Sequence, residues 1–427
     1  MPLKKLALKP GVNRERTRYS NETGWYECDK VRFRQGYPEK IGGWQRISDN
    51  TFQGVCRSLW SWVTLSNQRF VGVGTNLKFY LELGGVYYDI TPIRATTTST
   101  ATFAATNGSS TVTVTDASHG AMVGDFVTFS GAVSLGGNIT ADVLNQEYQI
   151  QTVPNSNTYT ITATATANAS DTGNGGGSVT AAYQISVGDA ISVPLTGCGG
   201  GAWSSGVWGT GGTTASPMRL WSQSNFGEDL IFGPRGGGIY YWDAGTGPSS
   251  RAVNISTLSG ASDTPTVQNF ILVSDINRFV FAFGVNTIGT STQDPMLIRW
   301  SDQEDAANWT PSATNQAGSL RLSRGTEIVT AQQARQEVLV WTDSSVYSLQ
   351  YLGGQAVWGA QIVGDNISVA SQNAVAYASG ASFWMGRDKF YMYDGRTQAL
   401  PCDLRRYVFN DFNESQLDQV LDRKSVV

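Results

Sequence analysis

The apolar residues of this chain recur in short alternating runs separated by Gly- and Asp-containing turns. Two clear examples cover residues 338–349 and 382–395; each has an apolar run with an aromatic residue, a polar turn and a second run that reaches a tyrosine. Looser copies cover residues 69–80 and 229–243. Alternation around a short turn is typical of a β-hairpin. A hairpin that recurs along a chain indicates one supersecondary unit used many times.

Five such units occur at separations that suit the blades of a β-propeller. In that fold, short antiparallel sheets follow one another and hide their edges against their neighbours. The sequence therefore predicts an all-β protein with a propeller-like domain, and a β-sandwich with decorations is the alternative. The units cover residues 54–91, 219–242, 270–300, 327–351 and 375–393.

The composition changes abruptly at about residue 95. Residues 96–188 are rich in Thr, Ala, Ser and Asn, contain no Trp, and include alternating runs. This pattern predicts a small β-barrel or sandwich module inserted in a loop of the larger domain. The expected organisation is a basic N-terminal arm (1–50), a first blade (51–95), the inserted module (96–188), the remaining blades (189–421) and a terminal hexapeptide (422–427).

The terminal hexapeptide, Asp422 to Val427, does not continue the strand pattern. Its residues match a common sequencing adapter read through in frame. On that interpretation the natural chain continues beyond about Leu421, and the propeller is truncated here. A plain polar C-terminal tail is the alternative.

Charge is distributed unevenly along this chain of 427 residues, whose net charge is −4. Residues 1–46 hold eleven Lys/Arg and five Asp/Glu, a balance of +6, which leaves −10 on the remainder. A basic arm on an acidic body favours docking on a neighbouring subunit, and the arm could equally lie along its own domain. The candidate subunit-interface residues are Lys4, Lys5, Lys9, Arg14, Arg16, Arg18, Lys30, Arg32 and Arg34.

Residues of the types that catalyse reactions or bind metals are sparse. The cysteines Cys28, Cys56, Cys198 and Cys402 are scattered without a CxxC pair, and His119 is the single histidine, so a disulfide framework and a zinc site are disfavoured. A Ser/His/acid triad could use only His119, which sits in an expected turn. Neither a hydrolase-type carboxylate pair nor a phosphate-binding glycine loop stands out. We therefore expect no catalysis and no cofactor.

The acidic segment 301–310 is similar to the Asp-box turn of sialidase-type propellers, but it lacks the turn glycine and occurs once. Asp302, Glu304 and Asp305 carry the oxygen ligands that calcium prefers. Because a complete ligand loop is absent, we expect a solvated acidic turn.

Two tryptophans, Trp203 and Trp208, lie in a Gly/Ser/Thr-rich loop at residues 195–216. Exposed Trp on such a loop can bind a sugar or a partner protein. The favoured interpretation is that the rings cap an open core, because scattered surface aromatics need no function.

Two stretches resemble tail proteins of short-tailed bacteriophages. One runs from Leu8 to Asn13 and from Glu22 to Trp44; the other consists of residues 299–302, 308–311 and 317–322. With the hairpins, they resemble the tail nozzle proteins (tail tubular protein B) and the related hub, or DNA-stabilisation, proteins. The resemblance covers roughly residues 1–95 and 190–421, and the 96–188 module is a lineage-specific insertion on this interpretation.

The resemblance implies a structural virion protein without catalytic residues. Such proteins form a ring, typically six-fold, below the portal and adaptor, which retains the packaged genome and conducts DNA during ejection. The implied partners are further copies of the chain, the adaptor and portal, and tail needle or fibre proteins, with only transient passage of DNA. A mildly acidic body suits a channel through which a polyanion slides.

The implied location is the virion tail, after assembly in the host cytoplasm. No apolar run approaches the ~20 residues of a membrane span, and the N-terminus lacks the long apolar core of a secretory signal. Two alternatives use the same scaffold: a receptor- or glycan-binding tail propeller acting through Trp203, Trp208 or the inserted module, and a glycan hydrolase.

Overall fold

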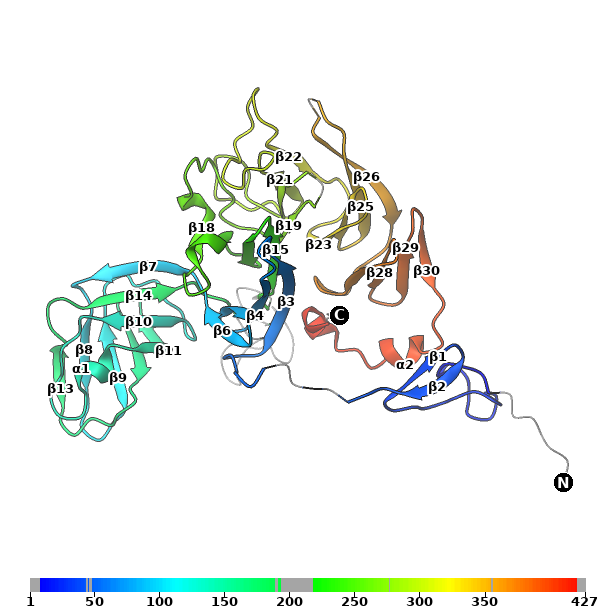
Figure 1. Ribbon diagram of the computed structural model, residues 1–427. Coiled ribbons are helices and arrows are strands. Elements are labelled where there is room, and N and C mark those ends of the chain that lie inside the picture. The colour runs from blue at the N-terminus through cyan, green and yellow to red at the C-terminus, as the bar shows by residue number, and fades with distance from the viewer. Residues whose placement is uncertain are drawn as a thin grey trace, which may run out of the picture.

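Short strands joined by tight turns form most of this protein. The computed structural model describes residues 8–43, 45, 48–188, 191–192, 218–275, 277–354 and 356–420 (Figure 1). Within these residues, five four-stranded antiparallel sheets follow one another around a common centre as the blades of a β-propeller, and an eight-stranded sheet lies to one side. The predicted all-β fold, a propeller with an inserted β module, is confirmed.

Each blade is a meander of four consecutive strands. Blade 1 contains β3 (Cys56–Val63), β4 (Arg69–Thr75), β5 (Phe79–Leu83) and β6 (Val86–Asp89). Blade 2 contains β15 (Trp221–Phe226), β16 (Asp229–Pro234), β17 (Tyr240–Trp242) and β18 (Val253–Asn254). Blade 3 contains β19 (Phe270–Val273), β20 (Val280–Phe283), β21 (Leu297–Trp300) and β22 (Gly318–Arg321).

The last two blades have the same plan. Blade 4 contains β23 (Ile328–Gln333), β24 (Val338–Thr342), β25 (Ser345–Tyr351) and β26 (Trp358–Asp365). Blade 5 contains β27 (Val375–Ala378), β28 (Ala381–Met385), β29 (Phe390–Tyr393) and β30 (Thr397–Leu400). The first strand of each blade is innermost, because β3, β15, β19, β23 and β27 contact one another in that order. Two single 3₁₀ turns, η1 (Ala244–Thr246) and η2 (Ile255–Thr257), flank β18.

Hydrophobic side chains join each blade to the next. Separate buried clusters connect blade 1 to blade 2, blade 2 to blade 3, blade 3 to blade 4, and blade 4 to blade 5. Aromatic residues anchor them: Trp62 packs edge-on against Trp242 between blades 1 and 2, and Trp341 packs against Trp384 between blades 4 and 5. Burial of such large apolar surfaces supplies most of the stabilisation of a domain of this kind.

Glycines in β4 allow blades 1 and 2 to approach closely. A Cβ atom on Gly74 would lie 2.5 Å from the ring of Trp221, and one on Gly72 would lie 2.2 Å from the side-chain oxygen of Gln223. The alternating Gly–Val–Gly pattern of this strand therefore leaves room for blade 2, which is a usual reason for glycine inside a strand.

Blade 5 and blade 1 share no buried hydrophobic cluster among the described residues. We call this junction the seam. One hydrogen bond crosses it, from the side-chain amide of Asn373 to the carbonyl of Arg57 in blade 1 (3.4 Å), and the side-chain amide of the adjacent Gln372 donates to the carbonyl of Trp221 in blade 2 (3.3 Å). Polar contacts close the ring at this point, in place of the apolar packing found between the other blades.

The inserted module occupies the connection between blades 1 and 2. Its strands lie in the order β13-β8-β9-β12-β11-β10-β14-β7, and the bulged strand β11 belongs to both halves of the sheet. One cluster of buried side chains from both halves forms its core. The elements are β7 (Ile93–Thr98), β8 (Thr102–Ala105), β9 (Thr111–Thr115), β10 (Phe126–Ser130), α1 (Ala141–Leu144), β11 (Glu147–Asn155), β12 (Thr158–Thr162), β13 (Asp171–Asn174) and β14 (Thr180–Gln184).

The N-terminal arm lies beside the segment that follows blade 5, and the last described residues turn back toward the centre of the propeller (Figure 1). The arm carries one two-stranded hairpin, β1 (Val31–Arg34) and β2 (Tyr37–Lys40). After blade 5 come the short helix α2 (Arg405–Phe409) and the 3₁₀ segment η3 (Glu414–Gln419). None of the helices in the described ranges has the length and apolar character needed to cross a membrane.

Candidate partner interface

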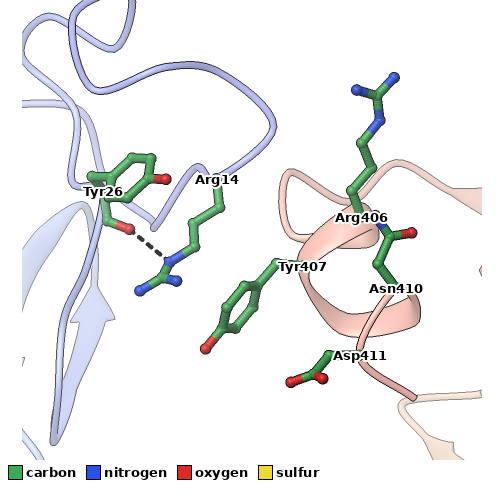
Figure 2. Close-up of a pocket in the computed structure, with 6 residues that line it drawn as sticks. All are labelled: Arg14, Tyr26, Arg406, Tyr407, Asn410 and Asp411. Carbon is green, nitrogen blue, oxygen red and sulfur yellow. Dashed lines mark hydrogen bonds between the residues drawn. The ribbon is translucent and has the colours of Figure 1, made fainter. Parts of the chain in front are cut away.

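The N-terminal arm docks on α2 of its own chain, and Arg14 is the central contact. Its Nε donates to the carbonyl of Tyr26 (3.2 Å), and its guanidinium lies 4.1 Å from the centre of the Tyr407 ring (Figure 2). Glu27 adds an ion pair at 3.3 Å. A guanidinium stacked on an aromatic ring and paired with a carboxylate holds a chain segment with geometric specificity.

Backbone contacts extend this docking. The amides of Arg14 and Glu15 donate to the carbonyl of Asp403 (3.0 and 3.1 Å), and the Glu15 carboxylate accepts from the amide of Arg406 (2.6 Å). The arm therefore lies along its own chain over Arg14 and Glu15. This is one of the two arrangements that the sequence left open.

An open cleft of about 330 Å³ separates the arm from α2 and the residues that follow it. Arg14 and Tyr407 point toward each other across it, while the side chain of Arg406 points away (Figure 2). The lining carries both signs of charge, because it includes Arg14 and Arg406 as well as Asp411. A cleft of mixed charge suits contact with a protein surface better than selection of a single ion.

The other predicted interface cations divide into paired and unpaired groups. Arg32 forms two hydrogen bonds with Glu39, both 3.2 Å, and Arg18 stacks on Tyr26 at 5.0 Å. Within the described part of the arm, five exposed cations form no ion pair: the predicted residues Lys9, Arg16, Lys30 and Arg34, and also Lys40. Lys4 and Lys5 lie outside the described residues, as do Trp203 and Trp208.

The seam presents apolar side chains next to this arm. In β3, Trp60 and Trp62 point toward blade 2, so the alternating Leu59 and Val63 point to the opposite face, where each is 55% exposed. On blade 5, Phe390 is half-buried and contacts Phe409 of α2. In an evenly closed ring, blade 1 and blade 5 would pack against each other, but here the facing sides of these two sheets are only partly covered.

The C-terminal segment is fastened beside the seam by a charged contact. Asp418 accepts two hydrogen bonds from Arg235 of blade 2 (3.0 and 2.8 Å) and one from Ser192 (2.8 Å). Burial raises the pKa of Asp418, but the hydrogen bonds and positive charge of Arg235 outweigh burial and hold this pKa below its ordinary value. Asp418 therefore stays ionised and fixes η3 to blade 2.

The segment 299–310 has a structural role in blade 3. Arg299 is completely buried and pairs with Asp263 (Nη2 to Oδ2, 2.8 Å), while it also donates to the carbonyls of Asp263 and Trp309. In the acidic turn, Asp302 accepts from the amides of Gln303 and Gln316. Over the described ranges, no three His, Cys, Asp or Glu side chains are grouped in a way that could hold a metal ion.

His119 belongs to the core of the inserted module. It is 3% exposed, its Nδ1 accepts from the amide of Ala121 (3.0 Å), and its ring packs edge-on against Tyr159 at 4.9 Å. Tyr159 and Tyr183 share a hydrogen bond (2.9 Å), and Tyr183 also donates to Asp116 (2.6 Å). The histidine thus orders a turn against a buried polar network, which is a structural contribution.

One charged cluster has no counterpart in the sequence reasoning. Lys78 is 3% exposed and bonds to Asp89 of blade 1 (2.9 Å) and to Glu147 of the inserted module, and Arg251 of blade 2 lies 3.2 Å from Asp89 and 3.6 Å from Glu147. Burial raises the pKa of Asp89, but the two cations outweigh burial and lower it. These residues are far apart in the sequence and share no motif, so only the fold could reveal them.

Comparisons with known proteins give weak structural alignments only. Neither a protein-family model nor a curated protein matches this chain. Among solved structures, the phage phi92 endosialidase aligns at 14% identity and a TM-score of 0.26 over 77% of this chain, which spans about half (52%) of that protein. The extracellular domain of BT4673 from B. thetaiotaomicron aligns at 9% identity and a TM-score of 0.29 over 87% of this chain and 58% of its own.

The designed protein Ika8 aligns at 11% identity and a TM-score of 0.26, over 82% of this chain and 88% of its own. Scores this low identify no common function among these proteins.

Proposed function

We propose that this protein is a structural subunit of the tail nozzle or hub of a short-tailed bacteriophage. In this role, copies of the chain form a ring, typically of six, that retains the packaged genome and later conducts DNA during ejection. The observation that carries the proposal is the seam: a propeller that leaves Leu59 and Val63 exposed, beside a docked arm whose described part has five exposed cations without an ion pair. Apolar faces rimmed by charge are typical of protein–protein contacts.

The residues behind the resemblance fit a scaffold role. Arg299 and Trp309, which belong to the stretch similar to nozzle and hub proteins, are completely buried and hold blade 3 together. Both side chains are used for packing and hydrogen bonding inside the protein, as expected of a family without catalytic residues.

The DNA path would run between subunits. Gln372 of the segment before blade 5 donates to the carbonyl of Trp221 in blade 2, and this contact occupies the inner end of the propeller. A duplex therefore needs a channel formed by a ring of several propellers. Head-to-tail contacts between different patches build such closed rings.

Assembly of the full-length protein tests the proposal. Mass photometry and negative-stain electron microscopy of the purified chain at physiological salt should show ring particles of uniform size. Replacing Leu59 and Val63 together by Lys should abolish the rings, because charges at an apolar contact oppose association, and should leave the monomer folded since both positions are exposed.

The matched control is Val253→Lys, which changes a 45% exposed valine on the outermost strand of blade 2. It should assemble as the unaltered protein does. A monomer at every concentration, or rings that survive the double substitution, would contradict the proposed role of the seam.

A further inference from the structure

A second cleft, of about 570 Å³, lies where the inserted module meets blade 1. The propeller contributes Gln53, Gly54 and Leu77, and the module contributes residues of β10, β11 and β12 together with Thr164. The walls thus come from two separately folded parts of one chain. Ligand sites occur preferentially at junctions of this kind.

Buried ion pairs hold the two parts in a fixed relation. Lys78 of the propeller binds Glu147 of the module as well as its own neighbour Asp89, and Gln184 donates to Glu147 at 2.6 Å. Arg251 supplies a second positive charge on the same pair of carboxylates. A cleft whose walls are fixed in this way loses little conformational freedom when a ligand binds.

The same ion pairs and hydrogen bonds determine how much charge the cleft presents to a ligand. Glu147 lines it, but its two oxygens already face Lys78, Arg251 and Gln184. The ammonium of Lys78 is in turn occupied by two carboxylates. Because no cation among the lining residues faces the opening, the cleft offers little to a phosphate or a nucleic acid.

Uncharged hydrogen-bonding groups form the exposed rim. Gln53, Gln151, Thr162 and Thr164 are all exposed. One amide hydrogen of Gln151 is used, in a bond to the carbonyl of Gln149 (3.2 Å). An amide side chain has two donor hydrogens and an acceptor oxygen, and a threonine hydroxyl can donate and accept. The rim can therefore bond to several hydroxyl groups at once.

Apolar atoms complete the site. Leu77 from blade 1 and Phe126 from the module lie beside the polar rim, with Phe126 held 4.5 Å from the Lys78 ammonium. A ligand that matches this lining needs many hydroxyls, no net charge and some C–H surface. We propose that the cleft binds a neutral oligosaccharide, so that the inserted module and blade 1 together recognise a carbohydrate surface.

This site goes beyond the proposed ring function and does not depend on it. A glycan array that displays bacterial surface oligosaccharides, neutral and acidic, should show binding of the full-length protein to neutral members. Gln151→Ala should weaken binding of the best neutral oligosaccharide by about fivefold, as expected for loss of one or two neutral hydrogen bonds at about 0.5–1.5 kcal/mol each. Thr164→Trp should fill the cleft and abolish binding.

The control is Gln398→Ala, which removes an exposed glutamine from blade 5 and should bind as the unaltered protein does. Circular dichroism and ring assembly, measured on every variant, separate loss of the site from loss of the fold or of the oligomer. Failure to bind any neutral oligosaccharide, binding of acidic ones alone, or binding that Thr164→Trp leaves intact would overturn the proposal.

Discussion

Replacing Asp263 by Asn removes one negative charge from blade 3 and leaves the shape of the side chain unchanged. Asp263 has a positive φ of 42°, which Asn tolerates about as well as Asp. The change therefore tests the ion pair with Arg299 without adding backbone strain. Arg299 would keep its bonds to backbone carbonyls and lose its only carboxylate partner among the described residues.

The structure sets the expected magnitude. With 2.8 Å between the charged atoms, the attraction is about 6 kcal/mol at an effective dielectric constant of about 20. Asp263 is 26% exposed, so water offsets part of this loss, and Asn still offers a neutral acceptor worth about 1 kcal/mol. We expect the free energy of unfolding to fall by about 3 kcal/mol, at the lower end of the range for breaking a buried pair.

Urea denaturation followed by tryptophan fluorescence measures the effect, because Trp309 is buried and its carbonyl accepts from Arg299. The midpoint should fall by about 1 M at a typical slope. The matched control is Asp294→Asn, which weakens the pair with Arg321 in the same blade, where Arg321 is 60% exposed. Exposed pairs contribute about 0–1 kcal/mol, so this midpoint should move little.

A second variant tests whether the uncompensated charge of Arg299 causes the loss of stability. Adding Arg299→Met to Asp263→Asn removes the uncompensated buried charge, so the double variant should be more stable than Asp263→Asn alone. Equal midpoint shifts for Asp263→Asn and Asp294→Asn, or no recovery in the double variant, would refute the reasoning that burial makes this pair important.

Two further predictions concern the ion pair between Asp418 and Arg235 and the contact between blades 1 and 2. Because Arg235 lowers the pKa of Asp418, the stabilisation from this pair is present above the unfolded pKa of about 3.9 and is lost as the pH falls through the lower, folded value. Protection from amide exchange at residues 414–420, measured relative to the intrinsic exchange rate at each pH, should thus fall below about pH 4, and Asp418→Asn should show low protection at every pH; protection that stays constant with pH in the unaltered protein would contradict this. Gly74→Ala should lower the free energy of unfolding by about 1–3 kcal/mol, because its methyl group would overlap the ring of Trp221. Gly42→Ala, which meets no atom within 4 Å, serves as its control in thermal denaturation, and equal melting temperatures would disprove the overlap.

Local pattern was enough to place the hairpins. The runs at 338–349 and 382–395 became β24–β25 and β28–β29, with the turns at the polar positions. Hairpin register depends on neighbours a few residues apart, so alternation and turn residues specify it. The same logic located the inserted module, whose strands alternate and whose composition differs from the blades.

The candidate interface was only partly accessible to such reasoning. Charge counting identified the basic arm but could not separate Arg14, which is held by Tyr26 and Tyr407, from Arg16, which has no ion-pair partner within the described residues. That difference depends on α2, almost 400 residues later. Contacts between residues so distant leave no periodic trace in a sequence.

By itself, the sequence determined the secondary structure class, the recurring hairpins and the position of the insertion, because strand alternation and turn chemistry are local properties. Only the tertiary structure decided that the seam has no buried apolar cluster within the described ranges, that Lys78 joins the module to the propeller, and that Arg299 is buried against Asp263. Each of these depends on which surfaces meet after the chain has closed around the propeller axis. That closure determines which charged side chains are buried and which of them form ion pairs.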